Sequence, residues 1–181
     1  DAMPRGGRVT IRVSACQRGA AEGDLFILSG LSKICALPQM KLGWIVLAGE
    51  ARRAGIRDLL ELIADSYLSA STPVQWAAIE WLRQRETLTA PLKARIARNG
   101  SAAREVLGAR ALAMAAGWSQ VVELDQDCDE ESLGARLAED GVLVQPGYFY
   151  DYDSPVLVVS LLTPEEDFLA GLEAVRSGLS S

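Results

Sequence analysis

The 181-residue sequence predicts a mixed α/β fold, and three observations carry that prediction. Two short apolar runs that suit buried strands, residues 25–28 and 42–48, lie in the first half of the chain. A long stretch with helical spacing follows them. The last third then alternates strand and helix patterns in the order β-α-β-β-α, which places helices on one face of a small sheet.

In the first half, residues 1–20 are rich in small and basic side chains and are broken by Gly and Pro, with one short strand predicted at residues 9–13. The two apolar strands come next. Residues 50–68 carry apolar side chains at helical spacing and predict a helix.

A helix start is predicted at the sequence TPVQ, residues 72–75. It reads as a capping box: Thr72 accepts a hydrogen bond from a free amide, Gln75 reaches back, and proline takes the first helical position. Stop signals at Asn99-Gly100 and Gly117 divide the long helical stretch into segments. The predicted helices cover 72 to about 87, 90–99 and 101–116.

The last third opens with a strand at residues 121–124, followed by an acidic turn that can cap a helix at 132–140. Gly141 ends that helix. Thr163 to Glu166 reads as a second capping box, which opens a final helix to about Ser177. Between these helices, strands are predicted at 142–147 and 156–162.

The acidic turn also suggests a cation site, because Asp125, Asp127 and Asp129 alternate as in a calcium loop. The sixth position is Glu130, where such a loop needs glycine. A solvated turn with a helix cap is therefore the favoured interpretation.

Composition and charge exclude several functional classes. The chain is 49% hydrophobic with a net charge of −6, which suits a globular protein and argues against binding to a nucleic-acid backbone. Histidine is absent, which excludes Ser-His-Asp catalysis and His-ligated metals. No secretory leader or membrane-length apolar run is present, so we expect a cytoplasmic protein without membrane partners.

The chain has three cysteines, Cys16, Cys35 and Cys128, and no CxxC pair. Their odd number and wide spacing indicate neither a disulfide framework nor a zinc site. We expect free thiols, buried or half-exposed.

Lys33 is the residue with the clearest chemical potential, because it lies between the two apolar strands in a segment of small residues. A shielded lysine loses its charge and becomes a nucleophile that condenses with aldehydes. Ser29, Ser32 and a second cation, Lys41, complete a set suited to a phosphorylated aldehyde. On spacing alone, the alternative is that Lys33 and Lys41 flank a solvent-exposed turn.

The stretch GLSKICALPQMKLGW, residues 30–44, resembles the cofactor-lysine signature of class I/II aminotransferases, the fold-type I pyridoxal-phosphate enzymes. It keeps the lysine, the small residues before it, Ala-Leu-Pro and the closing Gly-Trp. It departs from the family pattern at Gln39, usually a small residue, and at Lys41, usually arginine.

The resemblance implies that Lys33 is the catalytic lysine, which forms the Schiff base with pyridoxal 5'-phosphate and later moves a proton of the substrate. Lys41 falls at the position where the family's arginine binds the cofactor phosphate. Ser32 is a further residue expected to contact the cofactor. The family's phosphate-binding hydroxyl falls at Gly30, and Ser29, one step earlier, is the replacement.

A second resemblance covers residues 141–175, which are similar to the C-terminal domain of the same family. There the family carries a carboxylate-binding arginine two residues before a serine. The matching residue is Val158, before Ser160, which puts ordinary amino-acid transamination in doubt. The resemblance as a whole covers roughly residues 22–178.

By this resemblance we expect three parts: the end of the cofactor-binding large domain in residues 1–70, connecting helices in 71–99, and an α+β small C-terminal domain in 100–181. Family members are considerably longer and form homodimers with active sites at the subunit interface. In this chain residues 67–75 are the candidate for a segment near that interface, and the alternative is that they only start a helix. The N-terminal half of family members supplies the aspartate that faces the pyridine nitrogen. We therefore expect a C-terminal fragment that is inactive alone.

The expected function of the parent enzyme is amino-group transfer between an amino acid and a 2-oxo acid. Two alternatives stay open: a C–S lyase on the same fold, and a non-catalytic aminotransferase-like domain for dimerisation or effector binding. The sequence upstream of Asp1 would separate the last from the others.

Overall fold

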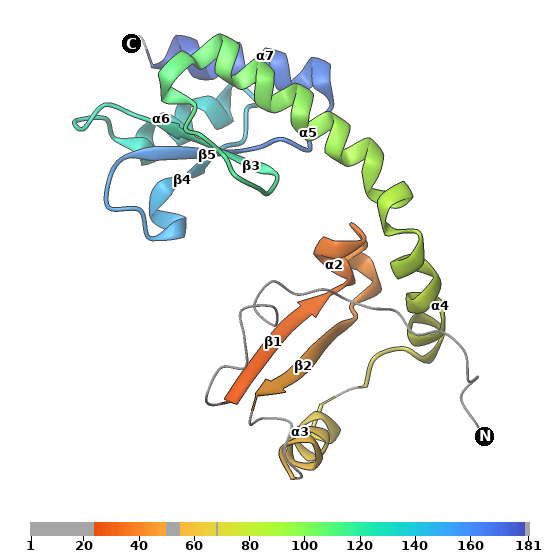
Figure 1. The fold of residues 1–181 in the computed structure, drawn as a ribbon. Coiled ribbons are helices and arrows are strands. Elements are labelled where there is room, and N and C mark those ends of the chain that lie inside the picture. The colour runs from red at the N-terminus through yellow and green to blue at the C-terminus, as the bar shows by residue number, and fades with distance from the viewer. Residues whose placement is uncertain (1–23, 50–54, 68, 180–181) are drawn as a thin grey trace. The chain divides into compact units, whose positions relative to one another are not determined.

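The computed structural model describes residues 24–49, 55–67 and 69–179 (Figure 1). The strand predicted at residues 9–13 lies outside them. The chain divides into two compact units, Asp1–Ala90 and Pro91–Ser181. The three-part domain scheme with borders at residues 70 and 99 stays a prediction.

The first unit is built on an antiparallel hairpin of β1 (Asp24–Gly30) and β2 (Gly43–Gly49). The register pairs Asp24 with Gly49 at one end and Gly30 with Gly43 at the other. Two short helical turns, α2 (Leu31–Ile34) and η1 (Pro38–Met40), fill the connection. Both predicted strands are confirmed.

The prediction that these strands are buried is wrong for the residues described. Phe26, Leu28 and Ile45 are 42%, 74% and 47% exposed. Leu28 and Ile45 are cross-strand partners, and partners share one face of a hairpin. An apolar run fits a strand buried on both faces, but this two-stranded sheet leaves one face uncovered among the described residues.

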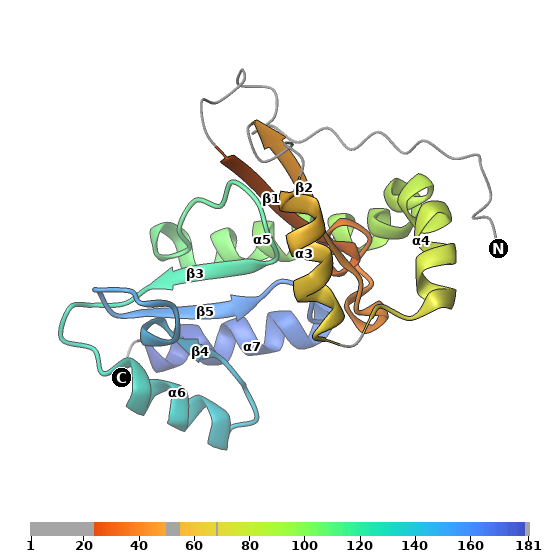
Figure 2. The same ribbon diagram turned by 90° about the horizontal axis from the view of Figure 1, so that it is seen from below.

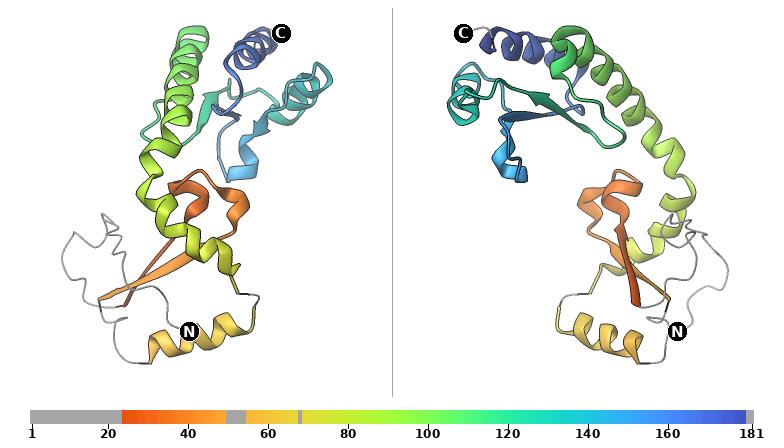
Figure 3. Two further views of the ribbon diagram at one scale, coloured as in Figure 1. Left: turned by 90° about the vertical axis from the view of Figure 1, so that its right-hand side faces the viewer. Right: turned by 60° about the vertical axis from the view of Figure 1, so that its left-hand side comes forward.

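Two longer helices follow the hairpin, α3 (Ile56–Asp65) and α4 (Thr72–Arg83). α4 packs on the connection between the strands, as Figure 3 shows. Its buried Ala78 and Leu82 form one cluster with Leu31 and Cys35. α3 lies within the predicted 50–68 helix, whose ends fall partly outside the described residues.

The capping box predicted at the start of α4 does not form. The N-cap is Ser71, one residue earlier, and no side chain caps the helix. Gln75 donates from Nε2 to the Ala70 carbonyl at 2.7 Å instead of reaching back to Thr72. The helix gains one residue at its start, so Thr72 becomes the first helical position.

α5 (Arg85–Leu107) runs without a break through the predicted stop at Asn99-Gly100, which is therefore wrong. Asn99 is fully buried, and its Nδ2 donates to the carbonyl oxygens of Leu161 at 3.0 Å and Thr163 at 2.9 Å. Tertiary hydrogen bonds thus override the local stop signal.

The helix predicted over residues 101–116 ends earlier than expected. α5 stops at Leu107, and Gly108 adopts a left-handed φ of 60° that suits glycine. The short turn η3 (Gly108–Arg110) comes next, and Ala111 then pairs with Val122 in a β-bridge. A bridge to the sheet replaces the last helical turns.

The second unit contains a three-stranded antiparallel sheet in the order β3-β5-β4 (Figure 2). β5 (Val156–Ser160) lies within its predicted range, and β3 (Ser119–Glu123) overlaps its predicted range but begins two residues earlier. β4 is only Gln145–Pro146, shorter than predicted. Pro146 has no N–H for the ladder, so the pairing ends there.

Helix α6 (Glu130–Glu139) confirms the predicted cap in the acidic turn. Asp129 is its N-cap and accepts from the amides of Glu131 at 3.1 Å and Ser132 at 3.2 Å. Asp125 instead accepts two hydrogen bonds from Arg110, at 3.1 and 2.9 Å.

The final helix is α7 (Glu165–Gly178), close to its predicted range. The second capping box is wrong, because Pro164 is the N-cap and offers no side-chain acceptor. Thr163 donates from Oγ1 to the Ser160 carbonyl at 3.3 Å. The turn η4 (Gly147–Tyr150) lies between β4 and β5.

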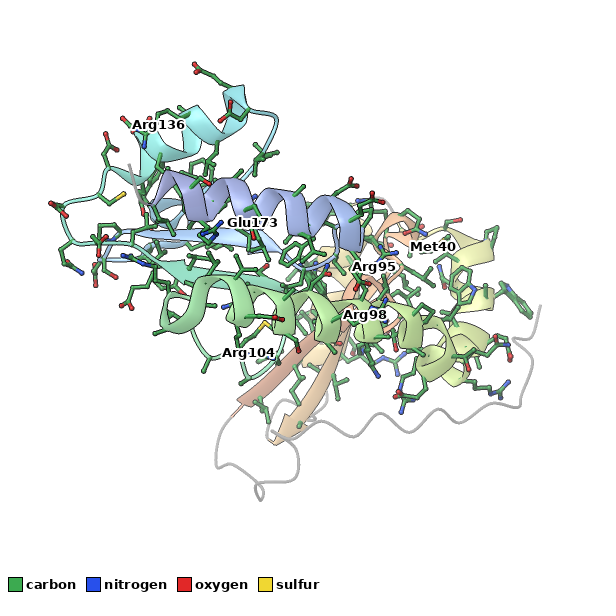
Figure 4. All side chains as sticks on the ribbon, turned by 90° about the horizontal axis from the view of Figure 1, so that it is seen from above. Met40, Arg95, Arg98, Arg104, Arg136 and Glu173 are labelled. Atoms are coloured by element: carbon green, nitrogen blue, oxygen red, sulfur yellow. The ribbon has the colours of Figure 1, made fainter. Side chains whose placement is uncertain are left out.

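The core of the second unit supports the predicted arrangement of helices on one face of the sheet. Leu157 and Val159 of β5 lie in one buried cluster with residues from α5, α6 and α7. Arg95 and Arg98 of α5 reach the start of α7 (Figure 4): Arg95 donates to the Leu162 carbonyl at 3.0 Å, and Arg98 pairs with Glu165 at 2.8 Å.

No helix within residues 24–49, 55–67 and 69–179 has both the length and the apolar character that crossing a bilayer requires.

Candidate functional site

A concavity of about 480 Å³ lies at the α2 end of the hairpin in the first unit. All four predicted site residues, Ser29, Ser32, Lys33 and Lys41, line it. The remaining lining residues are Leu28, Gly30, Leu42 and Gly43. Residues from both strands and from the connection therefore meet at one place.

The end of the hairpin sets the geometry of this concavity. The Leu31 amide donates to the Leu42 carbonyl at 3.0 Å, next to the Gly30–Gly43 pair. A Cβ on Gly30 would lie 2.8 Å from the Leu42 oxygen, so a larger residue would force the strands apart. Glycine at this position allows the close backbone approach that brings residues 33 and 41 to the same rim.

Lys33 lies on α2, a single helical turn. Leu31 and Cys35, two positions to either side of it, are 0% and 1% exposed. Ser32 is half-buried and Lys33 is exposed. Residues four apart share a helix face, so the buried pair leaves Ser32 and Lys33 to face away from α4.

Lys41 reaches the concavity through a strained turn. It caps η1 with a left-handed φ of 51°, and Ala36 on the other side of that turn has a φ of 57°. Non-glycine residues rarely adopt this conformation, which costs of the order of 1 kcal/mol or more at each position. Two such residues so close together indicate that the path of this turn is fixed by its surroundings.

The expectation that Lys33 is shielded is not met among the described residues, where both lysines are exposed. The physical reason is the same as for Leu28. The described part of the first unit forms a sheet of two strands, which leaves the rim of the concavity exposed. The lysine is positioned, but the unit itself does not desolvate it.

The donor set in the concavity fits a phosphorylated aldehyde. One primary amine can condense with the aldehyde, while a second cation and two hydroxyls can receive a dianionic phosphate. Lys33 and Lys41 come from opposite sides of the connection, and both line the concavity. The chemistry of these side chains is thus the one expected for pyridoxal phosphate.

Sequence reasoning missed one neighbour of the site, Cys35, to which it gave only the role of a free thiol. It is free and buried, and Cys128 is free and half-buried, as expected. The Sγ atom of Cys35 donates to the Trp81 carbonyl of α4 at 3.6 Å. Burial raises the pKa of the Cys35 thiol, and Arg85 opposes part of that rise. The sequence signal that could have identified Cys35 as a neighbour of the site was its spacing, two residues after Lys33.

Val158, which the sequence resemblance matches to the family's carboxylate-binding arginine, is 5% exposed in the middle strand of the second unit. It pairs with Val121 on β3 and Gln145 on β4. A buried aliphatic side chain cannot bind a carboxylate.

The sequence and the fold were compared with known proteins. The family described as "Aminotransferase class I and II" matches residues 7–170. No curated protein sequence matches the chain.

Among solved structures, an aminotransferase from Escherichia coli is 19% identical and superposes with a TM-score of 0.73 over 88% of this chain and 43% of its own. A double mutant of the Thermus thermophilus aspartate aminotransferase is 22% identical, with a TM-score of 0.71 over 85% and 41%. A Pyrococcus horikoshii kynurenine aminotransferase in complex with PMP is 18% identical, with a TM-score of 0.66 over 86% and 40%. The chain thus spans about two fifths of the length of these structures, which it resembles in fold.

Proposed function

The chain belongs to the class I and II aminotransferase family, and from that premise we propose that it is the lysine-bearing, C-terminal portion of a pyridoxal-phosphate-dependent aminotransferase. The parent enzyme transfers an amino group between an amino acid and a 2-oxo acid and acts as a homodimer. Residues 1–70 end its large domain, 71–99 connect, and 100–181 form its small domain. The two-fifths coverage of the similar structures supports this assignment.

One observation carries the proposal: Lys33, Lys41, Ser29 and Ser32 line a single concavity. Pyridoxal phosphate, when bound, supplies an aldehyde for an amine and a ring that accepts electrons. Lys33 Nζ is the amine that holds the cofactor and then carries a proton to and from the substrate carbon. Lys41 and the two hydroxyls bind the phosphate.

A non-catalytic aminotransferase-like domain is the second candidate, and Val158 is the observation that favours it. Without a cation at this strand position, the substrate carboxylate needs another partner. A C–S lyase of the same fold would face the same need. Amine transfer to 2-oxoglutarate, against release of ammonia and a 2-oxo acid, separates the two enzymes.

The test is covalent trapping on the 181-residue chain. The chain is mixed with pyridoxal phosphate, the C=N bond is reduced with borohydride, and the modified lysine is identified by peptide mass spectrometry. We expect the label on Lys33, its loss in Lys33→Ala, and its retention in the matched control Lys93→Ala, which removes a lysine of the second unit. Equal labelling of all lysines would overturn the proposal.

Activity is the complementary measurement. We expect little or no amine transfer by the chain alone, because none of the described residues that line the concavity offers a carboxylate to the ring nitrogen. Substantial turnover by the purified chain would contradict this part of the proposal.

A further inference from the structure

The helix that carries Lys33 has four residues and cannot be stable by itself. Helix nucleation is unfavourable, and isolated helices shorter than about 12 residues are marginal in water. No side chain caps α2 at its N-terminus. The direction of Lys33 therefore depends on what fixes this one turn from outside.

Two kinds of contact fix it. On the hairpin side, the Leu31 amide donates to the Leu42 carbonyl at 3.0 Å, while the Leu31 carbonyl accepts from the amides of Cys35 at 3.0 Å and Leu37 at 3.2 Å. On the helix side, the side chains of Leu31 and Cys35 are buried against Ala78 and Leu82 of α4. Both ends of α2 are thereby tied down.

The Cys35 thiol adds a polar contact between α2 and α4. Its acceptor, the Trp81 carbonyl, lies in the last turn of α4, which ends at Arg83. Carbonyls in a last turn have no amide partner within their helix. The thiol thus satisfies an acceptor at the end of α4 while it seals α2 onto that helix.

We propose that Cys35 is a positioning residue for Lys33: its buried side chain, hydrogen-bonded to the Trp81 carbonyl, sets the rotation of α2 and so aims the lysine into the concavity. Cys35 is the C-cap residue that directly follows the last helical residue of α2, and positions two apart on a helix are about 200° apart around its axis. Burying position 35 therefore turns position 33 to the opposite side. The cofactor consequence rests on the proposed function; the positioning itself does not.

The first arm of the test is borohydride trapping at limiting pyridoxal phosphate. We expect Cys35→Ala to lower the labelling of Lys33 about fivefold, through the combined loss of a weak thiol hydrogen bond and of the packing of the buried Sγ atom. Cys35→Ser keeps a donor of similar size and should restore most of the labelling. Cys128→Ala, which removes the other described thiol, should leave it unchanged.

The second arm reports on Lys33 without any cofactor. Lysines are acetylated competitively across a range of pH, and the reactivity of Lys33 is read relative to Lys93 in the same sample. We expect the pH profile of Lys33, and not that of Lys93, to shift in Cys35→Ala and to return in Cys35→Ser. Far-UV circular dichroism confirms that each variant is folded.

The outcomes distinguish the positioning role of Cys35 from the proposed function. If the natural chain traps no cofactor at Lys33 but Cys35→Ala still shifts its acetylation profile, the positioning role stands and the proposed function fails. If trapping occurs at Lys33 and neither readout responds to Cys35→Ala, the positioning role is overturned while the proposed function stands. A Cys35→Ser variant as impaired as Cys35→Ala would also overturn the hydrogen-bond role.

Discussion

The Glu130 carboxylate accepts a hydrogen bond from the Val156 amide at 2.8 Å, across 26 residues of sequence. Its other oxygen accepts from the Tyr148 amide at 3.0 Å. One side chain from the first turn of α6 therefore holds the aromatic turn η4 and the start of β5 in place.

Glu130→Ala should lower the free energy of unfolding by about 1–3 kcal/mol, because two amides lose a charged acceptor. Urea denaturation gives the value. Glu131→Ala is the matched control, since it removes the next carboxylate of the same helical turn and should have the smaller effect. Equal losses of unfolding free energy in the two variants would show that negative charge at the start of α6 is responsible, and not the two hydrogen bonds that Glu130 accepts.

Two glycines of the second unit should respond in opposite ways to alanine. A Cβ on Gly147 would lie 2.4 Å from Cγ2 of Val156, whereas a Cβ on Gly100 meets nothing closer than 3.8 Å. We expect Gly147→Ala to destabilise by about 1–3 kcal/mol through overpacking. Gly100→Ala, inside α5, should stabilise by about 0.5–1 kcal/mol through helix propensity.

Thermal and urea unfolding of the two glycine variants check this pair of predictions. Adding Val156→Ala to Gly147→Ala should recover part of the lost stability, because it removes the methyl group that clashes. A Gly100→Ala variant less stable than the natural chain would mean that α5 and β5 tolerate no added atom there.

The proposed phosphate-binding role of Lys41 predicts that Lys41→Met abolishes any preference of the concavity for a phosphorylated aldehyde over an unphosphorylated one. The side chain stays unbranched and nearly as long, but it loses its charge. We expect trapping of pyridoxal phosphate at Lys33 to fall about tenfold, while trapping of unphosphorylated pyridoxal stays the same. Lys41→Arg should retain the preference. A parallel loss with both aldehydes would place Lys41 in a structural role.

Asp129 should make the second unit sensitive to acid. Hydrogen bonds from the Ser132 hydroxyl and amide lower the pKa of its carboxyl. A carboxyl whose pKa is lowered by folding contributes stability that is present above its unfolded pKa, about 3.9. That stability is lost as the pH falls through the folded value.

Asp129→Asn keeps a capping oxygen but does not titrate. The stability difference between the natural chain and Asp129→Asn should therefore be constant near neutral pH and shrink below about pH 4. Urea denaturation across pH measures it. A difference that stays constant down to about pH 2 would contradict the assignment.

The strands and the amphipathic helices could be predicted from the sequence, because a period of two or 3.6 residues is a local property. Several helix ends could not, although the cap of α6 in the acidic turn was predicted correctly. At Asn99 the local pattern indicates a stop, yet the amide finds two carbonyls more than 60 residues away. At Thr72 and Thr163 the capping-box pattern is present, but the N-cap falls on a neighbouring residue, Ser71 and Pro164 respectively.

The members of the candidate site could also be predicted, because a signature of 15 residues carries all but Ser29. Their exposure could not. Whether an apolar strand or a lysine is covered depends on the number of layers around it, and residues 25–28 do not encode that number. The contact of Cys35 with Trp81 spans 46 residues, so the partner of the thiol could not be predicted from the local sequence.

The uncovered side of the hairpin has a practical consequence. Leu28 and Ile45 form an exposed apolar cross-strand pair, and within the described residues the two-stranded sheet has two unpaired edges, which can pair with other molecules. Self-association through such edges depends on how concentrated the sample is. Melting curves and labelling yields of the variants should therefore be compared at the same low micromolar protein concentration, with light scattering recorded alongside.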